Sequence, residues 1–240
     1  QCINDQLKNR VYGNVKFDFD ITKDLSLMVR AGLDNAVEAR SQRQATSTES
    51  RPEGYYREQD ITSNQYTADF LLKYDRKFFG EFNVTATFGG SIQYRNYMRK
   101  AQIADKLNLP GIYTLANSLN KVNVLDYRYE RQTNSLYGLI QLGWRNALFL
   151  DVTGLNYWSS TLPADNRSYF YPSVSGSVVL NELFDFGGSV LDLLKVRASW
   201  AQVGHDTSPY RYEEYLNSTA FPQGVSIPTI KPNNNLRPET

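Results

Sequence analysis

The sequence predicts an all-β fold built from antiparallel strands that run up and down along the chain. Apolar and polar residues alternate with a period of two in eight segments, and this is the side-chain period of a β-strand. The connections between these segments are alternately tight and long. Aromatic residues, which favour strands, are frequent, with 17 Tyr, 12 Phe and 3 Trp.

The eight alternating segments are the expected strands, in chain order. They cover approximately residues 11–21, 25–34, 65–74, 81–94, 135–144, 148–154, 169–180 and 194–201. The one modest helical pattern, in residues 181–194, contains Gly187 and Gly188, so we expect a turn or a single helical turn there.

The connections predict a sheet with short turns on one rim and long loops on the other. Residues 22–24, 75–80 and 145–147 are tight, residues 35–64, 95–134 and 155–168 are long and polar, and residues 181–193 are intermediate. A further polar stretch follows Gly204 and reaches Pro238 without another strand pattern. We therefore expect the chain to end inside a loop and to be a fragment of a larger fold.

One side-chain parity of the expected strands carries no charge. This apolar face comprises the odd-numbered positions of residues 11–33 and the even-numbered positions of the later segments, 42 positions in all. At a charged fraction of 21%, random placement would put about nine charged residues there. The opposite parity, the polar face, has 40 positions, of which 11 are charged. Those are Lys16, Asp18, Asp20, Arg30, Asp34, Asp69, Lys73, Glu81, Asp151, Lys195 and Arg197.

This pattern suits strands that cross a membrane, with lipid on one side and water on the other. It also suits a soluble sandwich that buries one face of each sheet, so the count alone leaves both open. Strands of ten residues and aromatic side chains near the strand ends favour the membrane. These aromatics are Tyr66, Tyr74, Tyr94, Trp144 and Trp200. No run approaches the roughly 18 apolar residues of a membrane-spanning helix.

Composition argues against several other classes. A net charge of +1 gives no basic field for nucleic acid. The single cysteine, Cys2, excludes a disulfide framework and is expected to be a free thiol. Gln1 precedes it without an apolar run, so no signal peptide or lipid anchor is readable here.

No catalytic, cofactor or metal site is predicted. His205 is the only histidine, which rules out two-histidine metal sites, and its place beside Gly204 in a loop favours a structural or exposed role. The same-face pairs Asp18/Asp20 and Lys195/Arg197 are expected to be solvated charges on the polar face. Gly89 and Gly90 lie inside a strand, where a bend is expected rather than a nucleotide loop.

Two strings carry a family resemblance. Asn166-Arg167 through Tyr171-Pro172-Ser173-Val174-Ser175, followed by Leu194-Lys195-Val196-Arg197-Ala198-Ser199-Trp200-Ala201-Gln202-Val203-Gly204, resembles the barrel of SusC/RagA-type TonB-dependent outer-membrane transporters of Bacteroidota. The closing Asn235-Leu236-Arg237-Pro238-Glu239-Thr240 is similar to the sequence that follows in that family. Gly176-Ser177 stands where members often have Gly-Trp, and His205 where asparagine is common.

The resemblance implies a transmembrane barrel of about 22 strands around an N-terminal plug, of which residues 1–240 supply about eight strands. It implies active uptake of large nutrients, oligosaccharides or peptides, across the outer membrane of a Gram-negative bacterium. The expected partners are the TonB complex, acting through a part absent here, a SusD-like surface lipoprotein and outer-membrane lipid. No enzyme activity and no cofactor are expected.

Aromatic residues of the long loops are the expected substrate contacts, because flat rings stack on sugars or pack against peptides. Packing among the loops themselves is an equal alternative. The residues are Tyr55, Tyr56, Tyr97, Tyr113, Trp158, Tyr210, Tyr212 and Tyr215. Two other functions stay open, a soluble, secreted β-sandwich that binds glycans through these loops and a β-rich glycoside hydrolase.

Pro172 is unusual because proline cannot donate to a strand ladder. It lies on the apolar face of the segment RSYFYPSVSGSVVLNE. Since a closed barrel has no free edge, we expect a bulge or a local break in the ladder near Pro172.

Overall fold

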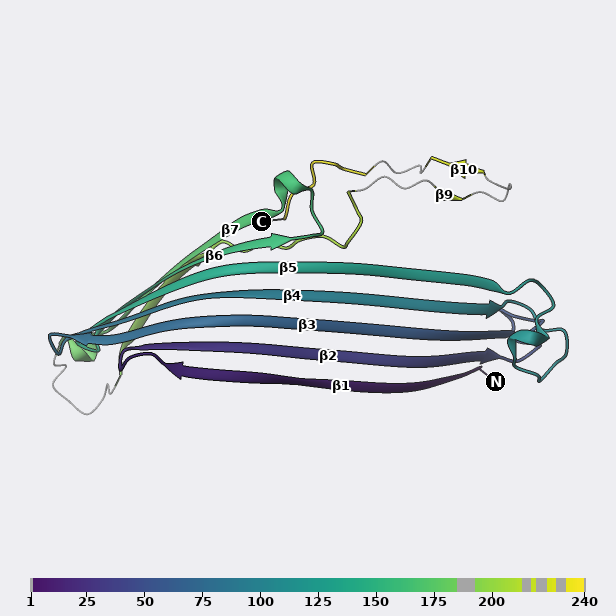
Figure 1. Ribbon diagram of the computed structural model, residues 1–240, viewed down its shortest axis with the longest axis horizontal. Coiled ribbons are helices and arrows are strands. Elements are labelled where there is room, and N and C mark those ends of the chain that lie inside the picture. Colours follow the sequence, from purple (N-terminus) through teal and green to yellow (C-terminus); the bar gives the residue numbers. More distant parts are fainter. Residues whose placement is uncertain (1, 185–192, 213–216, 219–223, 228–231, 240) are drawn as a thin grey trace. The chain divides into compact units, whose positions relative to one another are not determined.

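A computed structural model describes residues 2–184, 193–212, 217–218, 224–227 and 232–239. Eight strands form one sheet in chain order, so that each strand pairs with the next one along the sequence (Figure 1). They are β1 (Cys2–Asp20), β2 (Leu25–Gln44), β3 (Tyr55–Phe78), β4 (Phe82–Ala104), β5 (Asn123–Trp144), β6 (Leu148–Ser159), β7 (Ser168–Val179) and β8 (Lys195–Ala201). The predicted all-β, up-and-down fold is confirmed.

The remaining elements are short. Three single turns of 3-10 helix cover η1 (Leu115–Asn117), η2 (Ala164–Asn166) and η3 (Leu180–Glu182). The turn expected near residue 181 is therefore present as η3, while Gly187 and Gly188 lie outside the described residues. In the part of the chain that the structure describes, no helix is long and apolar enough to cross a membrane.

At the tight turns the strands begin and end within one residue of the predicted bounds, except that β3 continues to Phe78. At the other rim β1 to β6 are longer than predicted. The expected loop of residues 35–64 narrows to residues 45–54, that of residues 95–134 to 105–122, and that of residues 155–168 to 160–167. The rim with the longer loops is therefore confirmed, but the predicted loops were too long because the prediction followed apolar alternation. The outer parts of β2 to β5 are polar on both faces, so their extended backbone leaves no apolar signal.

Residues after β8 also differ from the prediction. β9 (Asn217–Ser218) and β10 (Val225–Ser226) pair as a small antiparallel sheet of their own, where no further strand was expected. Two residues per strand are too few to give a periodic pattern in the sequence.

The predicted faces are confirmed where the pairing is resolved residue by residue. Along β5 to β8, apolar-face positions lie opposite apolar-face positions without a shift, as in the row Ile140, Val152, Val174 and Trp200. A slip of one residue would have exchanged the two faces. Each of these rows thus presents apolar side chains to the same side of the sheet.

Pro172 causes no bulge. Its pairing with Gly154 lies within an unbroken register between β6 and β7. The carbonyl of Pro172 accepts from the backbone N–H of Gln202, so the missing N–H of Pro172 points to the same side, away from β6. There the ladder between β7 and β8 ends at the pair Ser173 and Ala201. The expected bulge is therefore absent, and the ladder between β7 and β8 ends beside the proline, where the reciprocal bond to Gln202 has no donor.

Gly89 and Gly90 are positions of close packing. A Cβ on Gly89 would lie 2.5 Å from the ring of Tyr137 on the polar face. One on Gly90 would lie 2.7 Å from the ring of Phe70 and 2.8 Å from Leu136 on the apolar face. Both glycines stay within β4 and make room for large side chains on both faces.

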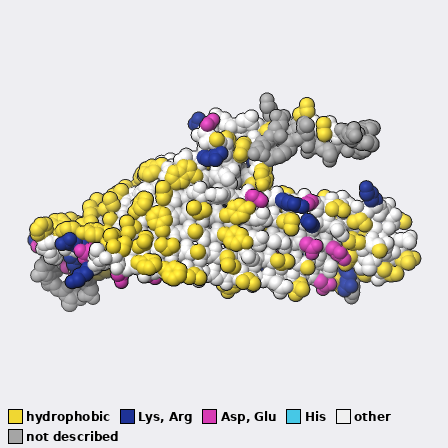
Figure 2. Space-filling view, viewed as in Figure 1, with side chains coloured by type: hydrophobic (Ala, Val, Ile, Leu, Met, Phe, Trp, Pro, Cys, Tyr) yellow, Lys and Arg dark blue, Asp and Glu magenta, His cyan; other side chains and the backbone are white. Residues whose placement is uncertain are grey.

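Very little of the chain is buried. Only seven hydrophobic residues of the described chain lie in a core, and they include Tyr55, Ala104 and Leu107 near the loops. By contrast Val11, Phe17 and Phe170 on the apolar face are 69%, 58% and 61% exposed. Figure 2 shows hydrophobic side chains gathered over the part of the sheet next to the tight turns, with charged side chains at the turns themselves. No second layer covers this face within the described residues.

The chain divides into two compact units. The first comprises residues 1–14, 32–67 and 94–130, and so contains the outer parts of β1 to β5 with the loops 45–54 and 105–122. Its small core lies where these loops meet, with Leu107 donating to the carbonyl of Glu53 and Lys106 paired with Glu53 at 2.6 Å. The second comprises residues 15–31, 68–93 and 131–240, with the tight turns and β6 to β10.

Candidate functional site

Three tyrosines form an aromatic cluster in the first unit. Tyr97 of β4 stacks on Tyr129 of β5 with ring centroids 5.1 Å apart, and Tyr127 meets both rings edge-on at 6.1 and 6.0 Å. The guanidinium of Arg99 lies 5.6 Å from the centre of the Tyr127 ring. We call Tyr97, Tyr127 and Tyr129 the tyrosine cluster.

The cluster lies on the polar face, and the strand period puts it there. Tyr127 and Tyr129 are two residues apart on β5, so both side chains point to the same side of the sheet. Tyr97 has the parity of the polar face on β4. Tyr127 is 50% exposed, so at least one ring is available to a ligand. Cross-strand aromatic pairs also stabilise a sheet, which fixes the rings in place.

One ion pair lies near the cluster on the polar face of the first unit. Glu38 and Arg40 on β2 form a hydrogen-bonded pair, and this bond from Arg40 holds the pKa of Glu38 below its usual value. A second pair lies on the opposite face of β5, where Arg128 donates to Asp126 at 2.7 and 3.0 Å and likewise lowers the pKa of Asp126. Charges of both signs thus stay ionised near neutral pH. Such a surface can meet the charged and polar groups of a large, mixed ligand.

The eight predicted aromatic residues do not form one site. Tyr55, Tyr56, Tyr97 and Trp158 lie in strands and not in loops, contrary to the prediction, because the strands extend beyond the apolar pattern. Tyr113, Tyr210 and Tyr212 lie in loops as predicted, and Tyr215 lies outside the described residues.

Several of these rings have local partners instead. Tyr55 is buried under the guanidinium of Arg51, 4.9 Å from the ring centre, and Tyr113 has Arg43 at 5.6 Å. Trp158 lines an apolar groove of about 480 Å³ beside Phe70. These contacts favour a packing role for the three rings.

Tyr56 faces away from the tyrosine cluster. It has apolar-face parity on β3 and donates to Glu58 at 2.8 Å, and burial raises the pKa of its hydroxyl. It lines a polar cleft of about 450 Å³ with Asp5, Ser41 and Asp60. Of the predicted residues, Tyr97 alone belongs to the cluster.

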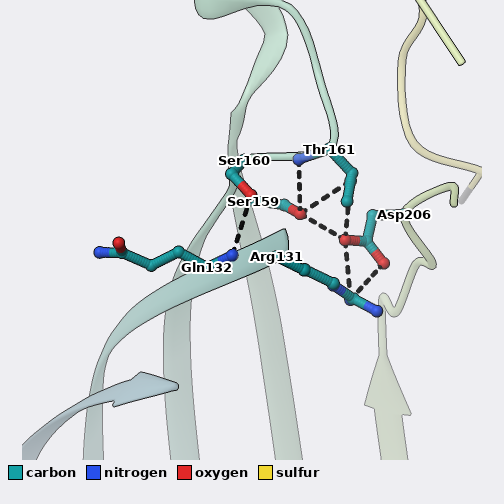
Figure 3. Close-up of polar contacts among 6 residues, drawn as sticks. All are labelled: Arg131, Gln132, Ser159, Ser160, Thr161 and Asp206. Atoms are coloured by element: carbon teal, nitrogen blue, oxygen red, sulfur yellow. Dashed lines mark hydrogen bonds and ion pairs between the residues drawn. The ribbon is translucent and has the colours of Figure 1, made fainter. Parts of the chain in front are cut away.

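A second polar group, in the second unit, was not predicted. Asp206, whose side chain is only 4% exposed, accepts two hydrogen bonds from Arg131 at 2.7 and 2.8 Å, and further ones from Ser159 and Thr161 (Figure 3). The carboxylate therefore fixes the segment after β8 to the middle of β5 and to the loop-side end of β6. His205 beside it is exposed and pairs through its backbone with Glu239, which agrees with a structural role.

The missed residues lacked a local signal. Tyr127 and Tyr129 fell in a stretch that was expected to be loop, although the spacing Tyr-x-Tyr is that of one strand face. The partners of Asp206 are 45 to 75 residues away along the chain. Among the described residues, no group of three or more His, Cys, Asp or Glu side chains is placed to hold a metal ion.

Comparison with known proteins identifies the fold. No protein-family model and no curated protein matches the sequence. Solved structures do match. A chain of the RagAB peptide transporter superposes with a TM-score of 0.86 at 17% identity, covering 99% of this chain and 27% of that one. Chains of the RagAB peptide importer in its closed-closed and open-open states give TM-scores of 0.85 and 0.79 at 18% and 21% identity.

The chain shares its fold with RagAB transporter chains. At these identities the likeness concerns the fold alone. The chain spans 27% of the length of each of these neighbours, so the larger part of such a protein has no counterpart here.

Proposed function

We propose that this chain is a segment of the transmembrane barrel of an outer-membrane active importer of the SusC/RagA type. The observation that carries the proposal is that, next to the tight turns, one face of a single sheet carries no charge and is left uncovered by the described residues. A soluble sandwich would pack such a face against a second sheet. Phe170 and Val11 remain more than half exposed instead, which suits lipid as the covering medium.

The fold likeness and the sequence resemblance support the same proposal independently. The sequence strings around Pro172 and Trp200 point to the SusC/RagA family, and the fold matches transporter chains over 99% of this sequence. Energy from TonB and a SusD-like surface lipoprotein as partner follow from that family. We assign both to the intact parent protein.

We propose peptides as the first candidate substrate and oligosaccharides as the second. Peptides are favoured by the similar RagAB peptide transporter and by the ion pair of Glu38 and Arg40 near the tyrosine cluster. Oligosaccharides are favoured by the stacked rings of Tyr97 and Tyr129, since sugars bind to flat aromatic faces. In either case the tyrosine cluster is the proposed contact surface.

Fractionation of cells that produce the intact parent protein tests the location. We expect the protein in the outer-membrane fraction after washing with carbonate or urea, and its release only by detergent. A freely soluble parent protein would contradict the importer and favour the soluble glycan-binding alternative.

Uptake by cells tests the contact surface. Tyr97→Ala together with Tyr127→Ala removes stacking partners, so uptake of labelled peptides or oligosaccharides should fall about tenfold once corrected for the amount of folded protein. Tyr66→Ala is the matched control, because Tyr66 stacks on Tyr94 with centroids 6.5 Å apart but on the apolar face. Equal uptake by the double variant and the control would remove the cluster from the substrate path.

A further inference from the structure

An apolar groove of about 300 Å³ crosses the apolar face next to the tight turns, within the second unit. Its walls come from four neighbouring strands. The lining side chains on the apolar face include Phe82, Trp144, Leu148, Leu150 and Val178. Two rows cross it in register, Trp144 with Leu148 and Val178, and Leu142 with Leu150 and Gly176.

Gly176 leaves an open space in the groove because it has no side chain. Its row carries leucines on β5 and β6, and the missing side chain on β7 leaves a hollow beside them. A Cβ built on Gly176 would meet only the carbonyl oxygen of Phe149, at 3.9 Å, so the space above this residue is open. No charged side chain lines the groove among the described residues.

A cation lies at the end of the groove that faces the turns. The guanidinium of Arg145, in the turn between β5 and β6, lies 4.9 Å from the centre of the Trp144 ring. Its Nη2 donates to Glu81 at 2.7 Å, and the side chain is 55% exposed. Arginine has five N–H donors in a fork that fits phosphate oxygens, so donors beyond the Glu81 contact can reach a ligand.

We propose that this groove binds an acyl chain of a glycerophospholipid whose phosphate accepts hydrogen bonds from Arg145. The site rests on the proposed membrane location, because only lipid would face these strands. Charge complementarity selects the ligand. An apolar chain fits a groove without charge, and an anionic phosphate fits the guanidinium at its end.

Two variants of the intact parent protein test the acyl-chain groove and the phosphate contact separately. Gly176→Leu fills the hollow without a clash in the sheet, as its open surroundings indicate. Arg145→Asn removes the guanidinium but keeps the turn, because Asn tolerates the positive φ of 49° at this position. Gly138→Leu is the matched control, since it adds the same side chain on the same face but outside this groove, with only the Thr87 carbonyl at 4.0 Å.

Native mass spectrometry of the detergent-purified parent protein, titrated with palmitoyl-oleoyl phosphatidylglycerol, measures the binding. We expect one lipid to bind most tightly, and its dissociation constant to rise about tenfold in Gly176→Leu and in Arg145→Asn but not in Gly138→Leu. Inorganic phosphate should not displace it, and diacylglycerol should bind more weakly and without dependence on Arg145. Unchanged phosphatidylglycerol binding in Gly176→Leu would contradict binding of the acyl chain in the groove. Tight binding of diacylglycerol would contradict the contact between Arg145 and the lipid phosphate.

The outcome is distinguishable from failure of the proposed function. A parent protein that is extracted from cells without detergent would refute the membrane location itself. A detergent-dependent, folded parent protein whose variants all bind phosphatidylglycerol equally would refute only the lipid site.

Discussion

Individual residues of this sheet are most constrained where side chains from neighbouring strands share one space. Gly90 is the clearest case on the apolar face, because Phe70 and Leu136 occupy the volume where its side chain would lie. Asp206 is the clearest polar case, since one carboxylate accepts hydrogen bonds from Arg131, Ser159 and Thr161. Both constraints join residues far apart in the sequence.

Gly90→Ala should destabilise the intact protein by about 1–3 kcal/mol, because the added methyl group overpacks a filled site. Gly138→Ala, where a Cβ would meet only the Thr87 carbonyl at 4.0 Å, should change the free energy of unfolding by much less. Urea unfolding in detergent micelles, followed by tryptophan fluorescence, compares the two. Equal stability of the two variants would show that the contacts of Phe70 with Gly90 relax freely.

Asp206→Asn should cost about 2 kcal/mol, because the amide cannot replace the charged hydrogen bonds from Arg131. Limited proteolysis should then cut the segment around residue 206 faster than in the unaltered protein. Asp165→Asn, at a carboxylate in η2, serves as the control. An unchanged cleavage rate in Asp206→Asn would mean that other contacts hold the segment.

Single residues were predictable from the sequence only where their role is local. The structural place of His205 follows from its neighbouring residues. The tyrosine cluster needed the observation that β5 begins at Asn123. The burial of Asp206 depends on contacts with residues far away in the sequence, and no local sequence pattern predicts such contacts.

At the scale of the strands, the part of each strand next to the tight turns was predictable from the sequence. The polar extensions of β1 to β6 toward the loops were not. Alternation of apolar and polar residues reflects contact of one strand face with an apolar medium, so the alternating pattern ends where the strand leaves that medium. β2 continues to Gln44 and β3 starts at Tyr55, although these parts carry polar side chains on both faces. Backbone hydrogen bonds between neighbouring strands hold the extensions, and they need no particular side chain.

A charge placed on either face of one strand tests the assignment of faces. Val152→Arg puts a cation in the middle row of the apolar face and should destabilise the inserted protein by about 2–4 kcal/mol. Thr153→Arg, one residue away on the polar face, should cost little. The folded fraction after insertion into lipid vesicles, read from heat-dependent gel mobility, compares them. Equal folding of both variants would contradict the assignment.

At the scale of the whole molecule, we propose that one face of a single sheet contacts lipid and the other contacts water. The fold class and the faces of β5 to β8 were derived from the sequence and agree with the structure. A larger architecture, with a plug, further strands and partners, is part of the proposal for the intact parent protein. Its assignment rests on family resemblance and fold likeness.

Spin labels placed one at a time along β6, from residue 149 to residue 154, test this account most directly. The intact protein is studied in lipid vesicles with Cys2 replaced by serine. Labels at 150, 152 and 154 should be accessible to oxygen dissolved in lipid, and labels at 149, 151 and 153 to a water-soluble nickel chelate. Accessibility to the nickel chelate at all six positions, without alternation, would contradict the account.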